Sequence, residues 1–308
     1  CCSSASACAA SSCIALLALL LAGCGSRPAG VPMDRSLAEL VPSDTILLAG
    51  VRMDALRATP VYRKWVGDNP VVNLDKFAKE TGLDPRKDVS ELLIASDGKR
   101  PVVLARGEFP VERLEEMLVR SGAKKTPYRG RALIGSGDAA VVFLNSRTAA
   151  AGPPAALRVA LDGGGGVPQG FRDRLKTVAP ETQIWLLASG VTPMLGKGIP
   201  DFGNLGGNLR KIADSVENVT VAFDLRAGLK MTAGGVCKTE QDAKFIHDAI
   251  RGLLGMGRLS TPDNEPELLR FYDSFQVAQR QTAIALNADI PMDVLESTLE
   301  RMKRLRSK

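Results

Sequence analysis

The stretch "DTILLAGVR", residues 44–52, is an apolar run that directly follows the turn-forming residues Pro-Ser-Asp at 42–44. Its length and composition are typical of a buried β-strand. A second stretch, "APETQIWLLASGV" (179–191), repeats the order of proline, turn and apolar run seen in "VPSDTILLAGV" (41–51). The similarity of these two stretches predicts that the chain contains two related halves.

Prolines at both ends of the halves support a duplication. Pro42 and Pro180 lie 138 residues apart, and so do Pro153 and Pro291. Pro153 and Pro291 each precede a stretch with leucines at helical spacing, and proline is favoured in the first turn of a helix. Equal offsets at both ends favour duplication; the alternative is a chance resemblance between two αβ segments.

The boundary between the halves is predicted at "DGGGGVPQG" (162–170), because no regular element would hold four consecutive glycines. The expected units are therefore residues 41–165 and 166–308. A phosphate-binding loop is the alternative interpretation of this glycine run. The sequence does not favour it, because no Lys-Ser or Lys-Thr pair follows the glycines at the spacing that such a loop requires.

The expected strands occur in adjacent pairs rather than in strict alternation with helices. "VSELLIAS" (89–96) and "PVVLARGEF" (101–109) flank a hairpin turn, and "NVTVAFDL" (218–225) precedes "LKMTAGGVC" (229–237). We therefore expect an α+β fold of two related halves, each a mostly antiparallel sheet with helices packed on one face. Further strands are expected at 127–135, 139–145, 275–281 and 282–288, and helices at 62–81, 110–122 and 153–161 and from 239 and 291 onward.

The leader contains nine unbroken apolar residues, Ile14 to Ala22. This run is too short to cross about 30 Å of hydrocarbon, which needs roughly 20 residues, but it has the length of a signal-peptide core. It ends at Leu21-Ala22-Gly23-Cys24, which resembles the lipobox of bacterial lipoproteins. The resemblance implies that residues 1–23 are a signal peptide cleaved between Gly23 and Cys24. It also implies a lipid on the Cys24 sulfur and an acyl chain such as palmitate on its nitrogen.

Two alternatives for the leader are an uncleaved anchor and an ordinary cleaved signal. No lysine or arginine precedes Arg27, and the sequence begins with cysteine. We therefore expect residues 1–12 to differ from the natural start. Residues 24–40 are expected to form the lipidated cysteine and a polar tether that holds the folded body off the membrane.

Gly25 and Ser26 follow Cys24, with no aspartate beside it. Within the lipoprotein family this pattern implies an outer-membrane location facing the periplasm. The membrane is then a partner through the lipid anchor, and an envelope protein is a possible second partner. The body resembles, loosely, uncharacterised two-repeat lipoproteins and secreted proteins of soil bacteria, a resemblance that implies no particular activity.

Few residues after the leader can do catalytic or metal chemistry. His247 is the single histidine and lies on the polar side of its expected helix, while Cys237 is the single cysteine of the body and is expected to be buried. A Ser-His-Asp triad and zinc or iron sites therefore lack ligands. No catalytic residue, metal or cofactor is expected. Glu112, Glu115 and Glu116 share one helix, as solvated carboxylates do, and a carboxylate hydrolase is the least favoured alternative.

The charge pattern does not favour nucleic acid as a partner. The net charge is +6, but only 5% of residues are aromatic, and the basic residues are interspersed with acids. The C-terminal "LERMKRLRSK" (299–308) is expected to be a cationic helix end that complements the helix dipole. Docking on anionic lipid is the alternative for this segment.

The sequence thus predicts a lipid-anchored, non-enzymatic binding or interaction module of the bacterial envelope. The alternative is a small-ligand binder that uses a cleft between the halves near Gly163–Gly166. A deep pocket between the halves would favour the ligand binder, whereas an exposed apolar patch would favour the interaction module.

Overall fold

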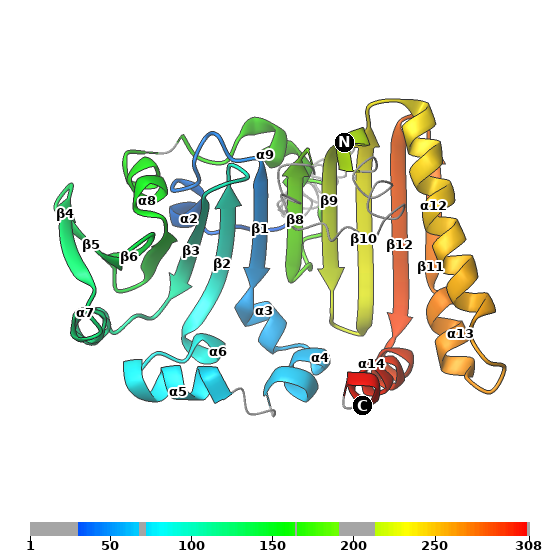
Figure 1. Ribbon diagram of the computed structural model, residues 1–308, viewed down its shortest axis with the longest axis horizontal. Coiled ribbons are helices and arrows are strands. Elements are labelled where there is room, and N and C mark those ends of the chain that lie inside the picture. The colour runs from blue at the N-terminus through cyan, green and yellow to red at the C-terminus, as the bar shows by residue number, and fades with distance from the viewer. Residues whose placement is uncertain (1–29, 68–71, 164, 191–212, 307–308) are drawn as a thin grey trace, which may run out of the picture.

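The computed structural model describes residues 30–67, 72–163, 165–190 and 213–306 (Figure 1). The predicted signal peptide, Gly23, Cys24 and the first part of the tether lie outside this range, as do the last two residues of the basic C-terminal segment. Within the described residues, no helix has both the length and the apolar character needed to cross a membrane.

One continuous antiparallel sheet of twelve strands runs through the described chain (Figure 1). The strands are ordered β11-β12-β10-β9-β8-β1-β2-β3-β7-β6-β5-β4. Their bounds are β1 (Leu47–Arg52), β2 (Val89–Ser96), β3 (Pro101–Gly107), β4 (Lys124–Tyr128), β5 (Arg131–Ser136), β6 (Ala139–Asn145), β7 (Thr148–Gly152), β8 (Ile184–Ser189), β9 (Val216–Asp224), β10 (Gly228–Cys237), β11 (Phe275–Arg280) and β12 (Ala283–Pro291). The predicted α+β class with antiparallel strands is confirmed.

The two halves share this sheet because β1 pairs with β8, whereas the sequence predicted a separate sheet for each half. Leu48 stands opposite Leu187, and Gly50 stands opposite Trp185. The Trp185 side chain is almost fully buried, and its indole lies over Gly50, where an added Cβ would be 2.3 Å from the ring. Both strands are apolar on both faces, so neither could serve as a solvated edge, and each satisfies the backbone of the other.

The order of the strands in the sheet is repeated in the two halves, in agreement with the proline spacing. Outward from the junction, the first half runs β1-β2-β3-β7-β6 and the second half runs β8-β9-β10-β12-β11. The halves therefore share one connectivity, as a duplication predicts. The first half adds the β4–β5 hairpin at its outer edge, and the second half has helix α13 at the corresponding point of the chain.

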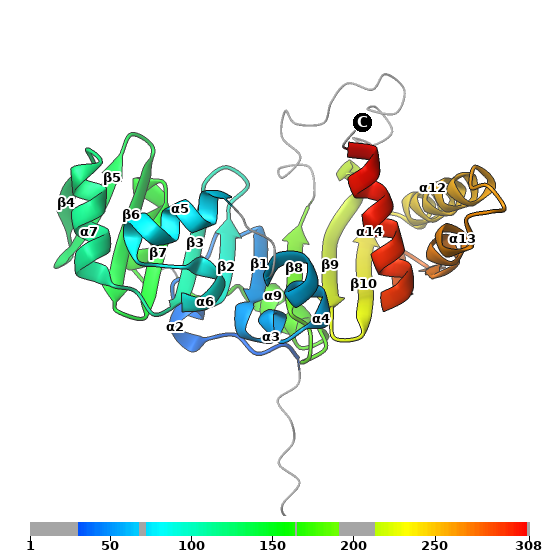
Figure 2. The same ribbon diagram turned by 90° about the horizontal axis from the view of Figure 1, so that it is seen from below.

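The helices are α2 (Arg35–Ala38), α3 (Met53–Arg57), α4 (Pro60–Tyr62), α5 (Val72–Thr81), α6 (Pro85–Asp88), α7 (Val111–Arg120), α8 (Pro154–Leu161), α9 (Gln169–Leu175), α12 (Glu240–Leu259), α13 (Pro266–Asp273) and α14 (Met292–Arg306), with a π-helical turn at Arg63–Gly67. We name the two faces of the sheet after Trp185 and Phe223, which point to opposite sides on neighbouring strands. Helices α2, α8 and α9 pack on the Trp185 face, and α7, α12 and α14 pack on the Phe223 face. Figure 2 shows α2 and α9 on one side of the sheet and α7, α12 and α14 on the other.

Helices were predicted on one face of each half, but α9 of the second half packs on the Trp185 face, opposite α12 and α14, and the first half also has helices on both faces. In the first half the reason is that strands β2 and β3 are apolar on both faces. Leu93 pairs with Leu104 in the core under α8, and Leu92 pairs with Ala105 in the core under α7. In the second half, β10 and β12 alternate between apolar residues that point to the Phe223 face and mainly polar or small residues that point to the Trp185 face. Their Trp185 face is therefore left largely open to solvent.

Two further local predictions differ from the structure. Residues 127–135 were expected to form one strand, but the chain turns at Arg129 and Gly130, whose φ angles are +48° and +74°. Positive φ at both positions is what a two-residue type I′ hairpin turn requires, and it divides the segment into β4 and β5. Strand β7, "TAAAG", was not predicted because its small residues carry little strand preference.

Candidate functional site

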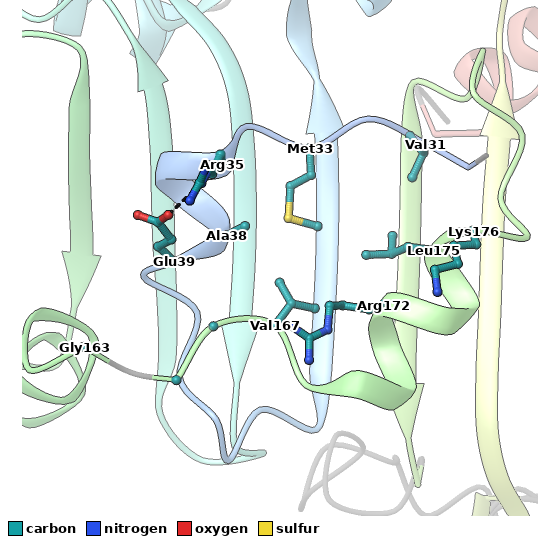
Figure 3. A pocket seen from close by; sticks show the side chains of 12 residues that line it. Val31, Met33, Arg35, Ala38, Glu39, Gly163, Val167, Arg172, Leu175 and Lys176 are labelled. Atoms are coloured by element: carbon teal, nitrogen blue, oxygen red, sulfur yellow. Dashed lines mark hydrogen bonds and ion pairs between the residues drawn. The ribbon is translucent and has the colours of Figure 1, made fainter. Parts of the chain in front are cut away.

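A hollow of about 630 Å³ lies on the Trp185 face (Figure 3). Three segments enclose it: the N-terminal strap (residues 30–40), the glycine loop (residues 163–167) and helix α9. We call this hollow the strap pocket. Its described lining residues are Val31, Met33, Arg35, Ala38, Glu39, Gly163, Gly165, Gly166, Val167, Arg172, Leu175 and Lys176.

The strap packs against helix α9 at its start and enters the core at Leu37. Gly30 lies so close to α9 that an added Cβ would be 2.2 Å from the Leu175 carbonyl oxygen. The Val31 N–H donates to that same carbonyl at 3.3 Å, and Leu37 is fully buried. Residues 30–40 were expected to belong to a polar tether. Within this segment Val31 and Leu37 are instead buried, and the strap forms one wall of the pocket.

The polar groups of the strap are paired with strand residues. The Asp34 N–H donates to both carboxylate oxygens of Glu91 at 3.2 Å, and Arg106 Nε lies 3.3 Å from Asp34 Oδ2. Burial raises the pKa of Glu91. Burial also acts to raise the pKa of Asp34, but hydrogen bonds from Ser36 and from the Leu37 N–H outweigh it and lower that pKa. These contacts fix the strap on β2 and β3.

The glycine loop needs its glycines where it meets the strap. Gly165 has a φ of +87°, forms a bridge with Pro42, and would place a Cβ 2.9 Å from the Ser43 Cβ. Gly163 and Gly166 also have positive φ angles, which L side chains rarely adopt. The hollow thus lies where the sequence placed a ligand cleft, near Gly163–Gly166, of which Gly164 lies outside the described residues.

Helix α9 presents one face to the core and another to the pocket. Phe171 and Leu175 are buried, whereas Arg172 and Lys176, four positions apart, stand at the pocket. Arg172 Nε donates to Gln169 Oε1 at 3.1 Å, and Lys176 Nζ lies 2.8 Å from Asp173 Oδ1. Hydrogen bonding by Lys176 lowers the pKa of Asp173.

Arg174 holds α9 on the sheet from its other side. Its guanidinium donates to the carbonyl oxygens of Ala188 and Val219 at 2.8 and 3.1 Å, and lies 4.6 Å from the centre of the Phe171 ring. Burial lowers the pKa of this guanidinium, as expected for a charge removed from water. The α9 wall of the pocket is therefore anchored to both β8 and β9.

The pocket combines an apolar interior with a charged rim. The side chains of Val31, Met33, Val167 and Leu175 converge on its centre (Figure 3). Three cations stand at the rim with one carboxylate, Glu39, which pairs with Arg35 at 2.9 Å. Such a site suits a molecule with an apolar body and an acidic head.

The chemically distinctive residues of the sequence lie away from the pocket. Cys24 and Gly23 are outside the described residues. Cys237 is buried, as predicted, and burial raises its pKa. His247 was predicted at the surface; its side chain is only 17% exposed, and its Nδ1 lies 2.9 Å from Asp248 Oδ1.

The helical carboxylates do not converge on a cavity. Glu115 pairs with Lys125 at 2.7 Å, and Glu116 pairs with Arg120 at 2.8 Å. Among the described residues there is no group of three or more His, Cys, Asp or Glu side chains suited to a metal ion.

The sequence did not identify Met33, Arg172 or Lys176 as site residues. A signal was available for the two cations, because they sit four residues apart on a helix whose other face carries Phe171 and Leu175. For Met33 there was none, since a lone methionine in a polar segment has no periodicity.

No protein-family model matches the sequence, and no curated protein matches it either. Among solved structures, the chain is similar to TP0453. Crystal form I of that protein superposes with a TM-score of 0.47 at 11% identity, covering 89% of this chain and 98% of that one. Crystal form IV gives a TM-score of 0.49 at 11% identity, covering 85% and 95%. At these values the likeness does not indicate a function.

Proposed function

We propose that this protein is a lipid-anchored, non-enzymatic binding protein of the bacterial envelope, and that the strap pocket binds an amphiphile with an acidic head. The observation that carries the proposal is the composition of the pocket. Its interior is apolar, and three cations stand at the rim. Arg35 pairs with Glu39 and Lys176 pairs with Asp173, while Arg172 forms no ion pair with a carboxylate among the described residues. An apolar tail would bury against the interior while the rim attracts the head.

The position of the pocket along the chain fits this role. The strap begins at Gly30, six residues after Cys24. A fully extended chain spans at most about 3.6 Å per residue, so Cys24 would lie within about 22 Å of the start of the strap. An anchored protein would therefore hold the strap pocket close to the bilayer, where amphiphiles are concentrated.

The resemblance of Leu21-Ala22-Gly23-Cys24 to a lipobox supports the proposed anchor and, with Gly25 and Ser26 after the cysteine, the proposed outer-membrane location facing the periplasm. Blocking lipidation tests the anchor independently of the pocket. In Cys24→Ala we expect an unprocessed precursor without incorporated palmitate. Normal processing and palmitate incorporation in this variant would contradict the anchor and leave the pocket proposal standing.

The pocket is tested with hexadecanoate carrying a photoactivatable group on its tail, added to the full chain in a non-ionic detergent. We expect saturable labelling of peptides containing Met33 or Val167, with competition by unlabelled hexadecanoate. Met33→Glu places a charge in the apolar interior and should abolish labelling. Met256→Glu is the matched control, because it makes the same substitution at a methionine that is 60% exposed on α12 and does not line the pocket. Equal labelling of the two variants would refute the site.

Substitutions that remove positive charge test whether the rim recognises the acidic head. Arg172→Gln combined with Lys176→Gln should weaken hexadecanoate binding about tenfold, the loss expected for a charge-assisted hydrogen bond. Binding of the neutral alcohol hexadecanol should change less than about twofold, because it carries no charge for the rim to attract. An equal loss for acid and alcohol would show that the rim does not recognise the head.

A further inference from the structure

A second hollow, of about 350 Å³, lies at the outer end of the first half, between the β4–β5 hairpin and helix α8. It shares no lining residue with the strap pocket. We propose that this hollow, which we call the hairpin pocket, binds the oxyanion group of a small phosphate- or carboxylate-bearing ligand. Its lining residues are Gly122, Lys124, Thr126, Leu133, Gly135, Ser136, Gly137, Ala139, Ala140, Pro154 and Arg158.

The pairing of the hairpin determines which side chains enter the hollow. Lys124 stands opposite Gly135, and Thr126 stands opposite Leu133, so these four residues share the face that meets α8. Lys125 points to the opposite face, where its Nζ lies 2.7 Å from Glu115. Two adjacent lysines of one edge strand are thus directed to different environments.

The two cations of the hairpin pocket are not neutralised by the protein. Lys124 and Arg158 form no ion pair with any carboxylate in the part of the chain that the structure describes. By contrast, the nearby cations Lys125 and Arg120 each form an ion pair with a glutamate of α7. The lining contains no carboxylate, so both positive charges can interact with an anionic ligand.

Asp162, the carboxylate that directly follows helix α8, is engaged with residues of the β4–β5 hairpin. Asp162 accepts a hydrogen bond from the Tyr128 hydroxyl at 2.7 Å and pairs with the Arg129 guanidinium. Arg158 lies over the Tyr128 ring, 5.6 Å from its centre, which orients the guanidinium toward the hairpin without neutralising it.

The remaining lining groups complete a binding site for an oxyanion. The hydroxyl of Thr126 is a further donor on the face that meets α8. An ammonium, a guanidinium and a hydroxyl form a donor set that matches phosphate or carboxylate oxygens. Leu133, Ala140 and Pro154 offer an apolar surface for a small ring or chain attached to the anionic group. The volume is near the lower end of those that hold small molecules.

Charged lysines on an edge strand also protect a sheet from pairing with another chain, and that role predicts no ligand. Lys124 and Lys125 separate the two explanations. Both are exposed on β4, and only Lys124 lines the hollow. Loss of either lysine would equally weaken the protection of the edge strand against pairing with another chain. Only loss of Lys124 would weaken oxyanion binding.

The experiment is isothermal titration of the full chain, in a non-ionic detergent at low salt, with phenyl phosphate and separately with benzoate. We expect saturable binding of at least one probe, and the tighter of the two identifies the preferred head group. Lys124→Gln and Arg158→Gln should each weaken it about tenfold, while Lys125→Gln should change it less than about twofold. Absence of saturable binding by both probes would overturn the proposal. So would an equal loss in Lys124→Gln and Lys125→Gln.

Discussion

Substitution of Gly50 by alanine tests the junction that joins the two halves into one sheet. An added Cβ would lie 2.3 Å from Cε2 and Cζ2 of Trp185, far inside van der Waals contact. The indole cannot swing into solvent without leaving the core, because Trp185 is only 1% exposed. Overpacking of this kind costs about 1–3 kcal/mol, so we expect Gly50→Ala to lower the free energy of unfolding by about 2 kcal/mol or more.

The assay is urea unfolding of the full chain followed by tryptophan fluorescence, to which Trp185 contributes. Gly170→Ala is the matched control, because Gly170 lies in α9 and no heavy atom stands within 4 Å of its added Cβ. Alanine is preferred to glycine within a helix, so this control should leave stability unchanged or raise it by about 0.5–1 kcal/mol.

A double-mutant cycle then assigns the loss to the indole. Trp185→Leu removes the ring that the new Cβ meets, so adding Gly50→Ala to that variant should cost much less than in the native chain. An equal cost of Gly50→Ala in both backgrounds would refute the packing argument. A stability of Gly50→Ala equal to that of Gly170→Ala would refute it too.

Burial and hydrogen bonding lead to further predictions. Leu37→Ala should lower the free energy of unfolding by about 3 kcal/mol, because the Leu37 side chain of the strap is fully buried in the core, and denaturation curves measure this loss. Leu259→Ser should change it by less than about 0.5 kcal/mol, because that side chain is 87% exposed at the end of α12; a larger loss would mean that α12 is covered. Burial acts to raise the pKa of Asp97, but hydrogen bonds from the Arg100 and Lys99 N–H groups outweigh it and lower the pKa to about 2. The carboxylate therefore stabilises the fold above its unfolded pKa near 3.8, and this contribution is lost as the pH falls toward 2. Asp97→Asn should reduce the loss of stability between about pH 4 and pH 2, and an unchanged acid profile would contradict the assignment.

The strands with clear alternation or long apolar runs were predictable from local sequence. Residues 89–96 were expected as a strand and form β2, and residues 139–145 form β6. The helix start at Thr239 also followed from sequence, because its hydroxyl accepts the Asp242 N–H, as a capping residue does. In these segments the chain's own pattern and its surroundings favour the same structure.

The pairing of β1 with β8 could not be read from local pattern, because it joins segments that are far apart in the sequence. Both are short apolar runs, and such runs do not reveal their neighbours. The strap was equally hidden, since Val31 and Leu37 are isolated apolar residues in a polar segment that becomes buried only when α9 is in place. The location of the strap pocket near the glycine loop was foreseen, whereas its apolar interior and cationic rim depend on these tertiary contacts.

A crystal structure of the full chain with bound hexadecanoate is the most direct test of the proposed function. We predict that the tail lies against Met33, Val167 and Leu175 in the strap pocket, with the carboxylate beside Arg172 or Lys176. A tail bound at another surface, or a strap pocket left without ligand at saturating hexadecanoate, would contradict the proposal.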